Sequence, residues 1–387
     1  MTVETHSLDQ LGNRLRLARV RADVTQSDAA DQLGMARTTL VAIEKGERRV
    51  RPDELIALAR LYHVTANELV RESAVHLDLQ PRFRALPATQ RARAEEPVAL
   101  LNRLAASELE LEQLLGRSPI RNYPPVRPIL PGDIEQQAEE AALEFRHRLG
   151  RGLAPLKDLL SLLESEIGIR IFIRPFDRSI SGLFAFDESA GACILLNENH
   201  TPARRLQSAA HEIGHFIATR HQPDVEGDHI PTNSREERFA KRFGFALLLP
   251  SPAARSYFAE CIRDHGRFSP RHLVTGAHRF GVSNEAFSRR LEDLQLLPKG
   301  TWESLKDRGF SGEFAHRLLS SGDKSTDSAG PVTPRLWLLA AEAYERELVS
   351  EEQLAHMLHL SRIDIRCVLD TLDVEGVDDL RSVATAR

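Results

Sequence analysis

The sequence predicts a mostly α-helical protein with one small α+β domain in the middle of the chain. Apolar residues recur at helical spacing over closely spaced short segments in residues 8–71, and again beyond residue 251. Between them, within residues 133–250, the runs at 169–174 and 192–196 are β-branched or apolar and are bounded by turn residues, which is typical of strands. We therefore expect an all-α N-terminal domain, an α+β central domain and helical C-terminal units.

Composition is that of an ordinary globular protein with more than one domain. The chain has 387 residues, 42% of them apolar and 28% charged, whereas a typical domain has roughly 100–200 residues. The net charge of −5 excludes a protein that coats nucleic acid or membrane with its whole surface, so any DNA contact must be local. The three cysteines lie far apart, which excludes a cysteine-rich zinc module. We see no signal peptide and no apolar run of the roughly 18–20 residues that a membrane helix needs, and expect a cytoplasmic protein.

Linkers and helical patterns divide the rest of the chain. Residues 72–117 are expected to form a helical connector, in which leucines recur near a 3.5-residue spacing at Leu101, Leu104, Leu111 and Leu115. This stripe predicts either the seam of a homodimer or packing against the chain's own body. Five prolines in residues 118–132 forbid regular helix and predict an extended linker. A helical extension at 251–320 and a last helical unit at 335–374 follow the α+β domain.

The C-terminal helical units repeat the pattern of the N-terminal domain. Residues 353–362 align with residues 28–37, so that their leucines and arginines coincide, although His359 replaces the turn glycine Gly34. Residues 280–291 likewise have the pattern of a turn followed by a helix. Both units are helix-turn-helix-like, and we expect them to pack within the protein rather than to bind DNA.

Within the N-terminal domain, two short helices are separated by a tight turn. Thr25 is a suitable N-cap for a helix that buries Ala29, and Gly34 ends that helix. A second helix begins near Arg37. The small buried side chain of Ala29 lets the two helices cross at the steep angle of a helix-turn-helix.

The second of these helices would meet the major groove of double-stranded DNA. Arginine can donate two hydrogen bonds to guanine, and threonine can bond a base edge or touch a thymine methyl group. The residues expected to contact bases are Arg37, Thr38 and Thr39. The residues expected to contact phosphates are Gln26, Lys45 and Arg48. Residues 8–71 carry 11 Lys and Arg against 9 Asp and Glu, so a monomer should bind weakly and a homodimer on a two-fold operator is expected.

This stretch resembles the helix-turn-helix of XRE (Cro/C1-type) repressors through Gln26, Gly34, Arg37-Thr38-Thr39, Ile43-Glu44 and Gly46. The resemblance covers about 60 residues and implies operator binding. The alternative is a helical packing domain that makes no DNA contact.

A second motif, His211-Glu212-Ile213-Gly214-His215, is an HExxH sequence. On a helix, histidines four residues apart project from one face and can share a metal ion. Glu212 could then take a proton from a metal-bound water, whose pKa the metal lowers toward ~7, without being a ligand itself. Thr201 as N-cap and Pro202 as first helical residue predict such a helix. The alternative is a helix whose two histidines only cap a polar patch.

Two residues compete for the third ligand position. His221 lies ten residues after His211, which is the spacing of the metzincin signature. However, Ala218 stands where that signature has a glycine, and the only later methionine, Met357, belongs to a different segment.

The other candidate is Glu237, near the start of a predicted helix capped by Ser234. The small residues Ala240 and Gly244 share a face with Glu237 and would let this helix lie close to the HExxH helix. Glu236 remains an alternative ligand, and Ser234 with Glu237 could instead form only a capping box.

HExxH followed by Glu237-x-x-Ala-x-x-Phe-x-x-x-Leu-Leu-Leu-Pro250 resembles the ImmA/IrrE family of zincin-type metallopeptidases over about residues 118–300. The resemblance implies a zincin-like fold and bound Zn²⁺, or alternatively Mn²⁺. It assigns His211, His215 and Glu237 as ligands and Glu212 as base, and implies that the edge of the 192–197 strand aligns a peptide. Lys241 departs from the family, which has Asn or Asp there, so a group that orients a ligand histidine is missing or comes from elsewhere.

Together these features predict a DNA-binding regulator with a zinc endopeptidase domain that cleaves itself or a partner repressor, which the resemblance suggests is of the XRE type. A peptide bond within residues 118–132 is the candidate self-cleavage site. The alternatives are a non-catalytic transcription factor that senses metal or ligand, and the antitoxin of a toxin–antitoxin pair. No membrane partner is expected.

Overall fold

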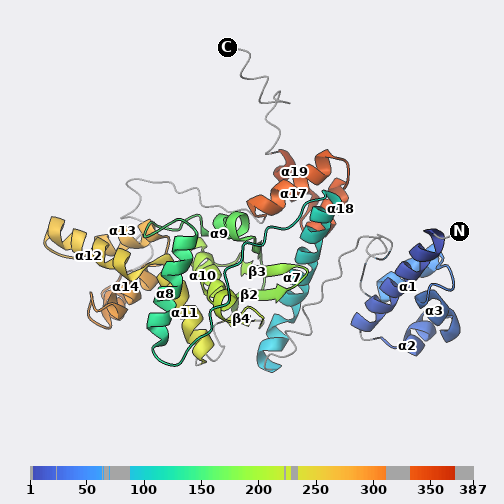
Figure 1. Cartoon of the computed structure of the whole chain (residues 1–387), viewed down its shortest axis with the longest axis horizontal. Helices are drawn as coiled ribbons and strands as arrows, with labels where there is room; N and C mark the ends of the chain where they lie inside the picture. The colour runs from blue at the N-terminus through green and yellow to red at the C-terminus, as the bar shows by residue number, and fades with distance from the viewer. Residues whose placement is uncertain are drawn as a thin grey trace, which may run out of the picture. The chain divides into compact units, whose positions relative to one another are not determined.

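The computed structural model describes residues 3–22, 24–62, 64, 69, 88–221, 224–227, 234–310 and 332–370. Predictions for residues 72–87, 311–320 and 371–374 lie outside these ranges. The chain forms two compact units, Met1–His76 and Leu77–Arg387 (Figure 1). None of the described helices is both long and apolar enough to cross a membrane.

The first unit is all α-helical. Its described helices are α1 (Val3–Arg21), α2 (Gln26–Gln32), α3 (Arg37–Glu44) and α4 (Pro52–Leu61). As predicted, the Thr25 hydroxyl caps α2 by accepting a hydrogen bond from the Asp28 N–H (3.1 Å), and Gly34 makes the turn with a φ of 62°. Gly12 of α1 lies against the end of α3, where a Cβ atom would come within 2.5 Å of the Ile43 carbonyl oxygen. These contacts hold α2 and α3 in a helix-turn-helix.

The second unit is built on a four-stranded sheet with the strand order β1-β3-β2-β4. The strands are β1 (Arg170–Arg174), β2 (Ile180–Asp187), β3 (Gly191–Asn197) and β4 (Asp224–Gly227). β1 and β3 are the two strands that the sequence predicts; β2 and β4 were not predicted. β3 pairs in parallel with β1 and antiparallel with β2, so it lies inside the sheet. The expectation that residues 192–197 offer a free edge to a peptide is therefore wrong, because both sides of this strand are already hydrogen-bonded.

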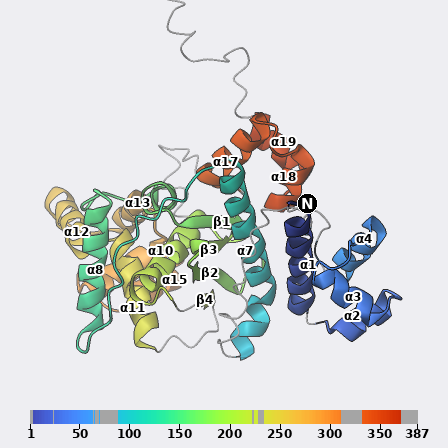
Figure 2. The same ribbon diagram turned by 45° about the vertical axis from the view of Figure 1, so that its right-hand side comes forward.

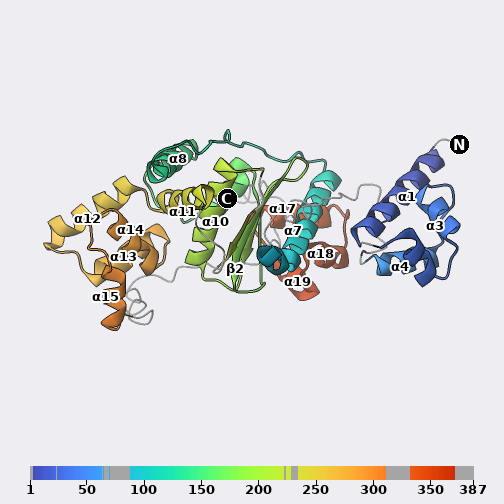
Figure 3. The same ribbon diagram turned by 90° about the horizontal axis from the view of Figure 1, so that it is seen from below.

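Helices cover both faces of the sheet (Figure 3). α10 (Pro202–Ala218) packs on one face, together with Ile171 and Ile173 of β1. α7 (Ala88–Leu114) covers the other face, and the alternate β1 residue Arg170 bonds to it. Strands buried on both faces read as continuous apolar runs, which is why the sequence reveals β1 and β3.

The remaining helices extend this core. α8 (Ile134–Arg148) packs against α11 (Arg235–Leu248), which in turn packs against α10. The others are α9 (Leu159–Leu162), the short π-helix η1 (Leu163–Ile167), α12 (Ser251–His265), α13 (Pro270–Phe280), α14 (Asn284–Asp293), α15 (Thr301–Asp307), α17 (Pro334–Glu345), α18 (Glu351–Leu358) and α19 (Arg362–Asp370). His359 ends α18 with a φ of 51°, so a histidine takes the left-handed position that Gly34 takes in the first unit.

The leucine stripe of α7 is buried within the chain itself. Leu101, Leu104 and Leu111 are fully buried, and Leu115 is 8% exposed. α7 packs against the sheet and also against α17 and α18 (Figure 2). Of the two explanations for the stripe, packing against the chain's own body is the one observed. The stripe therefore gives no support to a homodimer, which stays a prediction.

Residues 118–132 are extended, as their prolines predict, but they do not form a free linker. The Arg127 N–H donates to the Ile217 carbonyl (2.8 Å), and the Asn122 N–H donates to the Ile167 carbonyl (3.1 Å). The Tyr123 hydroxyl accepts a hydrogen bond from the Ala192 N–H (3.0 Å). The segment is thus fixed on the body of the second unit, which argues against its use as an exposed cleavage site.

A cluster of buried ions joins α7, the sheet and α17. Arg170 of β1 contacts Glu108 at 2.6 Å and Glu112 at 2.7 Å, and all three side chains are at most 3% exposed. Arg335 of α17 pairs with the same two glutamates. Because isolated buried charges are strongly unfavourable, we expect the loss of a single member of this cluster to be destabilising.

Glu164, at the edge of this cluster, should make stability depend on pH. Burial raises its pKa to about 8, although hydrogen bonds from Thr333 and Arg335 oppose the shift. Since the folded state holds this proton more tightly than the unfolded state, the free energy of unfolding should fall as pH rises from about 4.5 to 8.

A Glu164→Gln variant stays neutral at every pH. In urea unfolding it should match the native chain near pH 5 and be more stable by a few kcal/mol near pH 8.5, at about 1.4 kcal/mol per pKa unit. Unfolding curves that shift in parallel for both proteins would contradict this assignment.

Candidate metal centre and DNA-binding face

The HExxH motif lies on α10, the helix that the sequence predicts. Thr201 is the N-cap, with its hydroxyl accepting from the Arg204 N–H, and Pro202 is the first residue. His211 and His215 project from the same face, and their Nε2 atoms are 3.1 Å apart. Both rings are buried, with side-chain exposures of 8% and 5%.

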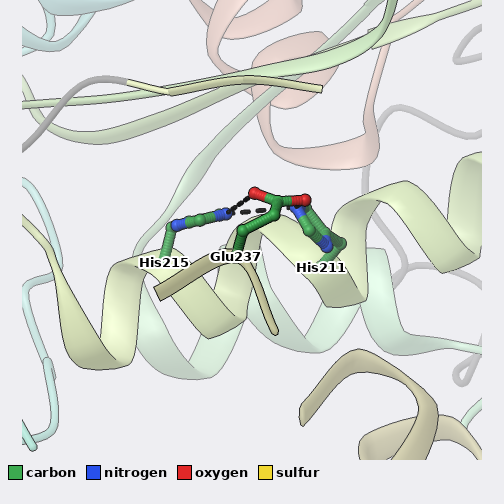
Figure 4. A group of neighbouring side chains, drawn as sticks. All are labelled: His211, His215 and Glu237. Atoms are coloured by element: carbon green, nitrogen blue, oxygen red, sulfur yellow. Dashed lines mark hydrogen bonds and ion pairs between the residues drawn. The ribbon is translucent and has the colours of Figure 1, made fainter. Parts of the chain in front are cut away.

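Glu237 reaches these two rings from α11 (Figure 4). Its Oε1 lies 3.4 Å from the His211 Nε2, and its Oε2 lies 3.4 Å from the His215 Nε2. Burial by itself would raise the pKa of Glu237, but hydrogen bonding and charge interaction with the two imidazoles outweigh it and hold the pKa well below its usual range. The carboxylate is therefore ionised, as a metal ligand must be.

The donor set fits a zinc ion. Four ligands at roughly 2.1 Å from a tetrahedral ion lie about 3.4 Å from one another, and the three measured separations are 3.1, 3.4 and 3.4 Å. Two imidazole nitrogens and one carboxylate oxygen are also ligands that zinc accepts, with one position left for water or substrate. In the described ranges, this is the only group of three or more such residues close enough to hold an ion.

Small residues bring the two helices close enough for this. A Cβ atom on Gly214 would lie 2.5 Å from the Ala240 Cα, and a Cβ atom on Gly244 would lie 3.0 Å from the backbone nitrogen of His211. Ser234 caps α11 by accepting from the Glu237 N–H (3.0 Å). The Glu237 carboxylate faces the imidazoles, so this residue contributes its backbone to the cap and its side chain to the metal group.

Glu212 follows His211 on α10 and is fully buried. It faces β2 at Gly182, where a Cβ atom would come within 3.2 Å of the Glu212 Oε1. A glycine at this point of the strand thus leaves the space that the carboxylate occupies.

The competing candidates lie elsewhere. His221 is exposed, and its ring packs edge-on against Phe186 with 5.2 Å between centroids. Glu236 points to solvent on α11. Lys241 is exposed too, so it offers no orienting contact to a ligand histidine.

Thr219 was not predicted and occupies that orienting position. Its hydroxyl donates a hydrogen bond to the His215 carbonyl (3.2 Å). The same oxygen lies 3.4 Å from the His215 Nδ1, where it can accept a hydrogen bond from a ring N–H. A proton on Nδ1 leaves the Nε2 lone pair free for a metal. The spacing of four residues after His215, one helical turn, is the signal that could have revealed it.

On the first unit, the predicted DNA-contact residues fall into two groups. Arg37 and Thr38 are exposed at the start of α3, Thr39 is half-buried beside them, and Lys45 is exposed at the end of that helix. These side chains lie as a groove-reading helix requires.

Gln26 and Arg48 are instead bound within the protein. The Gln26 amide donates to Glu44 (2.8 Å), which is buried and also pairs with Arg19 (2.6 Å). Arg48 donates two hydrogen bonds to Glu54, at 3.0 and 3.1 Å. A contact from Arg48 to phosphate would have to compete with this bidentate pair, a cost that sequence spacing does not reveal.

Comparison with known proteins identifies two domains in this chain. Residues 164–292 match the family model of the IrrE N-terminal-like domain, and residues 10–71 match that of a helix-turn-helix domain. The chain joins an XRE-type helix-turn-helix domain to an IrrE/ImmA-like domain. The chain is also similar to the cryptic phage CTXphi transcriptional repressor RstR of Vibrio cholerae. The two are 28% identical over 106 residues, which are 26% of this chain and 96% of that repressor.

The IrrE/ImmA-like domain thus contains the HExxH helix, the sheet and α11 within one matched region. The XRE-type domain contains the exposed start of α3. The resemblances inferred from the residues of these two regions are confirmed, and so is the mostly helical fold with one small sheet.

Removing the Thr219 hydroxyl should weaken metal binding without unfolding α10. A Thr219→Val variant keeps the side-chain shape but cannot accept a hydrogen bond from the His215 Nδ1. Loss of a hydrogen bond that orients a metal-binding histidine typically lowers metal affinity about 10–100-fold. Competition with a chelator measures this, and Thr219→Ser should restore the native affinity. Equal affinities for the valine and native proteins would exclude the orienting role.

Proposed function

We propose that this protein is a DNA-binding transcriptional regulator whose IrrE/ImmA-like domain is a zinc-dependent endopeptidase that cleaves itself or a partner repressor and so relieves repression. The observation that carries this proposal is the convergence of His211, His215 and Glu237 beside Glu212. The same chain carries a helix-turn-helix with exposed groove-facing residues, which supports a double-stranded DNA operator as partner.

The residues have distinct roles in this reaction. His211, His215 and Glu237 would hold a zinc ion, which would supply Lewis acidity for attack of water on a substrate carbonyl. Glu212 Oε takes the proton of the attacking water and passes it to the leaving amine. Thr219 keeps the Nε2 atom of His215 deprotonated for the ion.

The anchored segment at residues 118–132 directs the proposal toward a separate substrate. Its backbone is hydrogen-bonded to the domain, whereas a peptidase needs an extended chain that it can reach. We therefore place a partner repressor of the XRE type first among substrates. Self-cleavage at another segment remains the second choice.

A non-catalytic sensor is the other candidate function. Glu212 is 0% exposed, and the family's orienting residue is replaced by Lys241. Both observations favour a domain that holds metal but admits substrate only after a change of conformation. In this case operator binding would respond to metal while hydrolysis would not occur.

Incubation with Zn²⁺ distinguishes the two functions. The purified chain, alone and with purified XRE-type repressors from the same genome, is compared with a Glu212→Gln variant and with Glu236→Gln as the exposed control. The native and Glu236→Gln proteins should yield discrete fragments that the Glu212→Gln protein does not. If the native chain and all the added repressors stay intact, the peptidase function is wrong. A metal-dependent change in operator affinity would then favour the sensor.

A further inference from the structure

The helices that follow α11 carry a local excess of positive charge. Residues 251–283 contain five arginines against two acidic residues, in a chain whose net charge is −5. The helix-turn-helix domain at residues 8–71 has a surplus of only two positive charges over twice that length. Residues 251–283 therefore offer a local positive charge outside the predicted DNA-binding face.

The charges gather where α12 turns into α13. Gly266 ends α12 with a φ of 70°, and Ser269 begins α13. We define the α12–α13 corner by its five cationic or titratable residues: Arg263, His265, Arg267, Arg271 and His272. The rings of His265 and His272 lie 4.6 Å apart, and burial together with the neighbouring cations lowers the pKa of His272. The arginines of the corner are charged at every pH that the protein would meet.

Two of these arginines are free to bind a partner. Arg267 and Arg271 are exposed, and neither side chain forms an ion pair or hydrogen bond with any other described residue. Most arginines of this domain are engaged: Arg242 pairs with Glu135 and Asp293, and Arg289 pairs with Glu285 and Glu303. Within the corner, the only close acid is Asp264, which lies 3.3 Å from Arg263.

The helix-turn-helix-like pair α13 and α14 is not built to read bases. In α14, Phe287, Ser288 and Arg290 are buried, and the exposed Arg289 is held by two glutamates. The free positive charge is on the turn before α13 and on its first residues. Such a surface can contact the phosphate backbone, which carries no sequence information, without entering a groove.

We propose that the α12–α13 corner binds the phosphate backbone of duplex DNA, as a second and sequence-independent contact of this protein. The free guanidinium groups of Arg267 and Arg271 provide the phosphate contacts, and the positive end of the α13 dipole supports them. Because the XRE-type domain is in the same polypeptide, DNA held by one surface is at a raised local concentration for the other. This would strengthen a binding face whose own charge surplus is small, and it does not depend on peptidase activity.

Salt dependence of DNA binding tests the corner directly. Fluorescence anisotropy is measured for the full chain on a random-sequence 30-base-pair duplex across a range of NaCl concentrations. Each lost phosphate contact lowers the slope of log affinity against log salt by about 0.9. The Arg267→Ala/Arg271→Ala variant should therefore lose about one to two units of slope and bind several-fold more weakly at 0.1 M salt.

The Arg289→Ala/Arg346→Ala variant is the matched control. It removes two exposed arginines that are already paired with glutamates, so it changes the net charge equally without removing a free guanidinium. Both variants should keep the native thermal unfolding temperature because all four side chains are on the surface. A slope for Arg267→Ala/Arg271→Ala that equals the native or control slope would overturn the proposal.

Discussion

A Glu237→Ala variant should purify without stoichiometric zinc, whereas the native chain should hold one ion per molecule. The carboxylate lies 3.4 Å from the imidazoles of His211 and His215 and is the only acidic group in this cluster. Loss of a hydrogen bond to a metal ligand already lowers metal affinity about 10–100-fold. Loss of the ligand itself should therefore lower it on the order of 1000-fold or more. Metal content by mass spectrometry and affinity by chelator competition give the two readouts.

Glu236→Ala is the matched control, because this neighbouring glutamate points to solvent on the same helix. It should retain native zinc content. Stoichiometric zinc in the Glu237→Ala protein would show that the third ligand is another residue, and would return His221 to consideration. That result would also remove the main support for the proposed peptidase.

Replacing Arg170 by methionine should destabilise the second unit by about 3–5 kcal/mol. The substitution keeps much of the side-chain volume, but it leaves Glu108 and Glu112 buried next to a single remaining cation, Arg335. Removing one partner from a buried ion pair leaves an uncompensated charge, and that penalty is far larger than the net value of the pair. Urea unfolding followed by circular dichroism measures the difference.

Adding Glu108→Gln and Glu112→Gln to Arg170→Met should recover a substantial part of the lost stability, because the neutral amides no longer need a cation. The exposed Arg366→Met serves as a control and should change stability by less than about 1 kcal/mol. An Arg170→Met protein as stable as the native chain would mean that the cluster does not hold α7 and α17 to the sheet.

The difference between the strands found and missed in the sequence has a physical cause. β1 and β3 are buried on both faces and appear as continuous apolar runs. β2 contains Ser181 and Gly182, because it must leave space for Glu212, and these residues weaken its strand pattern. β4 is only four residues long, too short for any periodicity to be visible.

The grouping of His211, His215 and Glu237 could be predicted because it depends on local geometry. Two histidines four residues apart share a helical face wherever the helix lies, and Glu237 was distinguished from Glu236 by the face that it shares with Ala240 and Gly244. Thr219 follows the same periodicity. Its role depends on the ring proton of His215, a second-order effect that motif spacing alone does not indicate.

The sequence by itself determined the elements whose signals are local: the capped helices, the HExxH spacing, the turn glycines and the resemblance to two known domains. Only the tertiary structure decided which surfaces are already occupied. It showed that α7 uses its leucines within the chain, that β3 has no free edge, that residues 118–132 are bound to the domain, and that Arg48 is paired while Arg267 and Arg271 are not. The reason is that a pattern of residue types gives the chemistry a segment offers, whereas long-range packing determines which partner takes it.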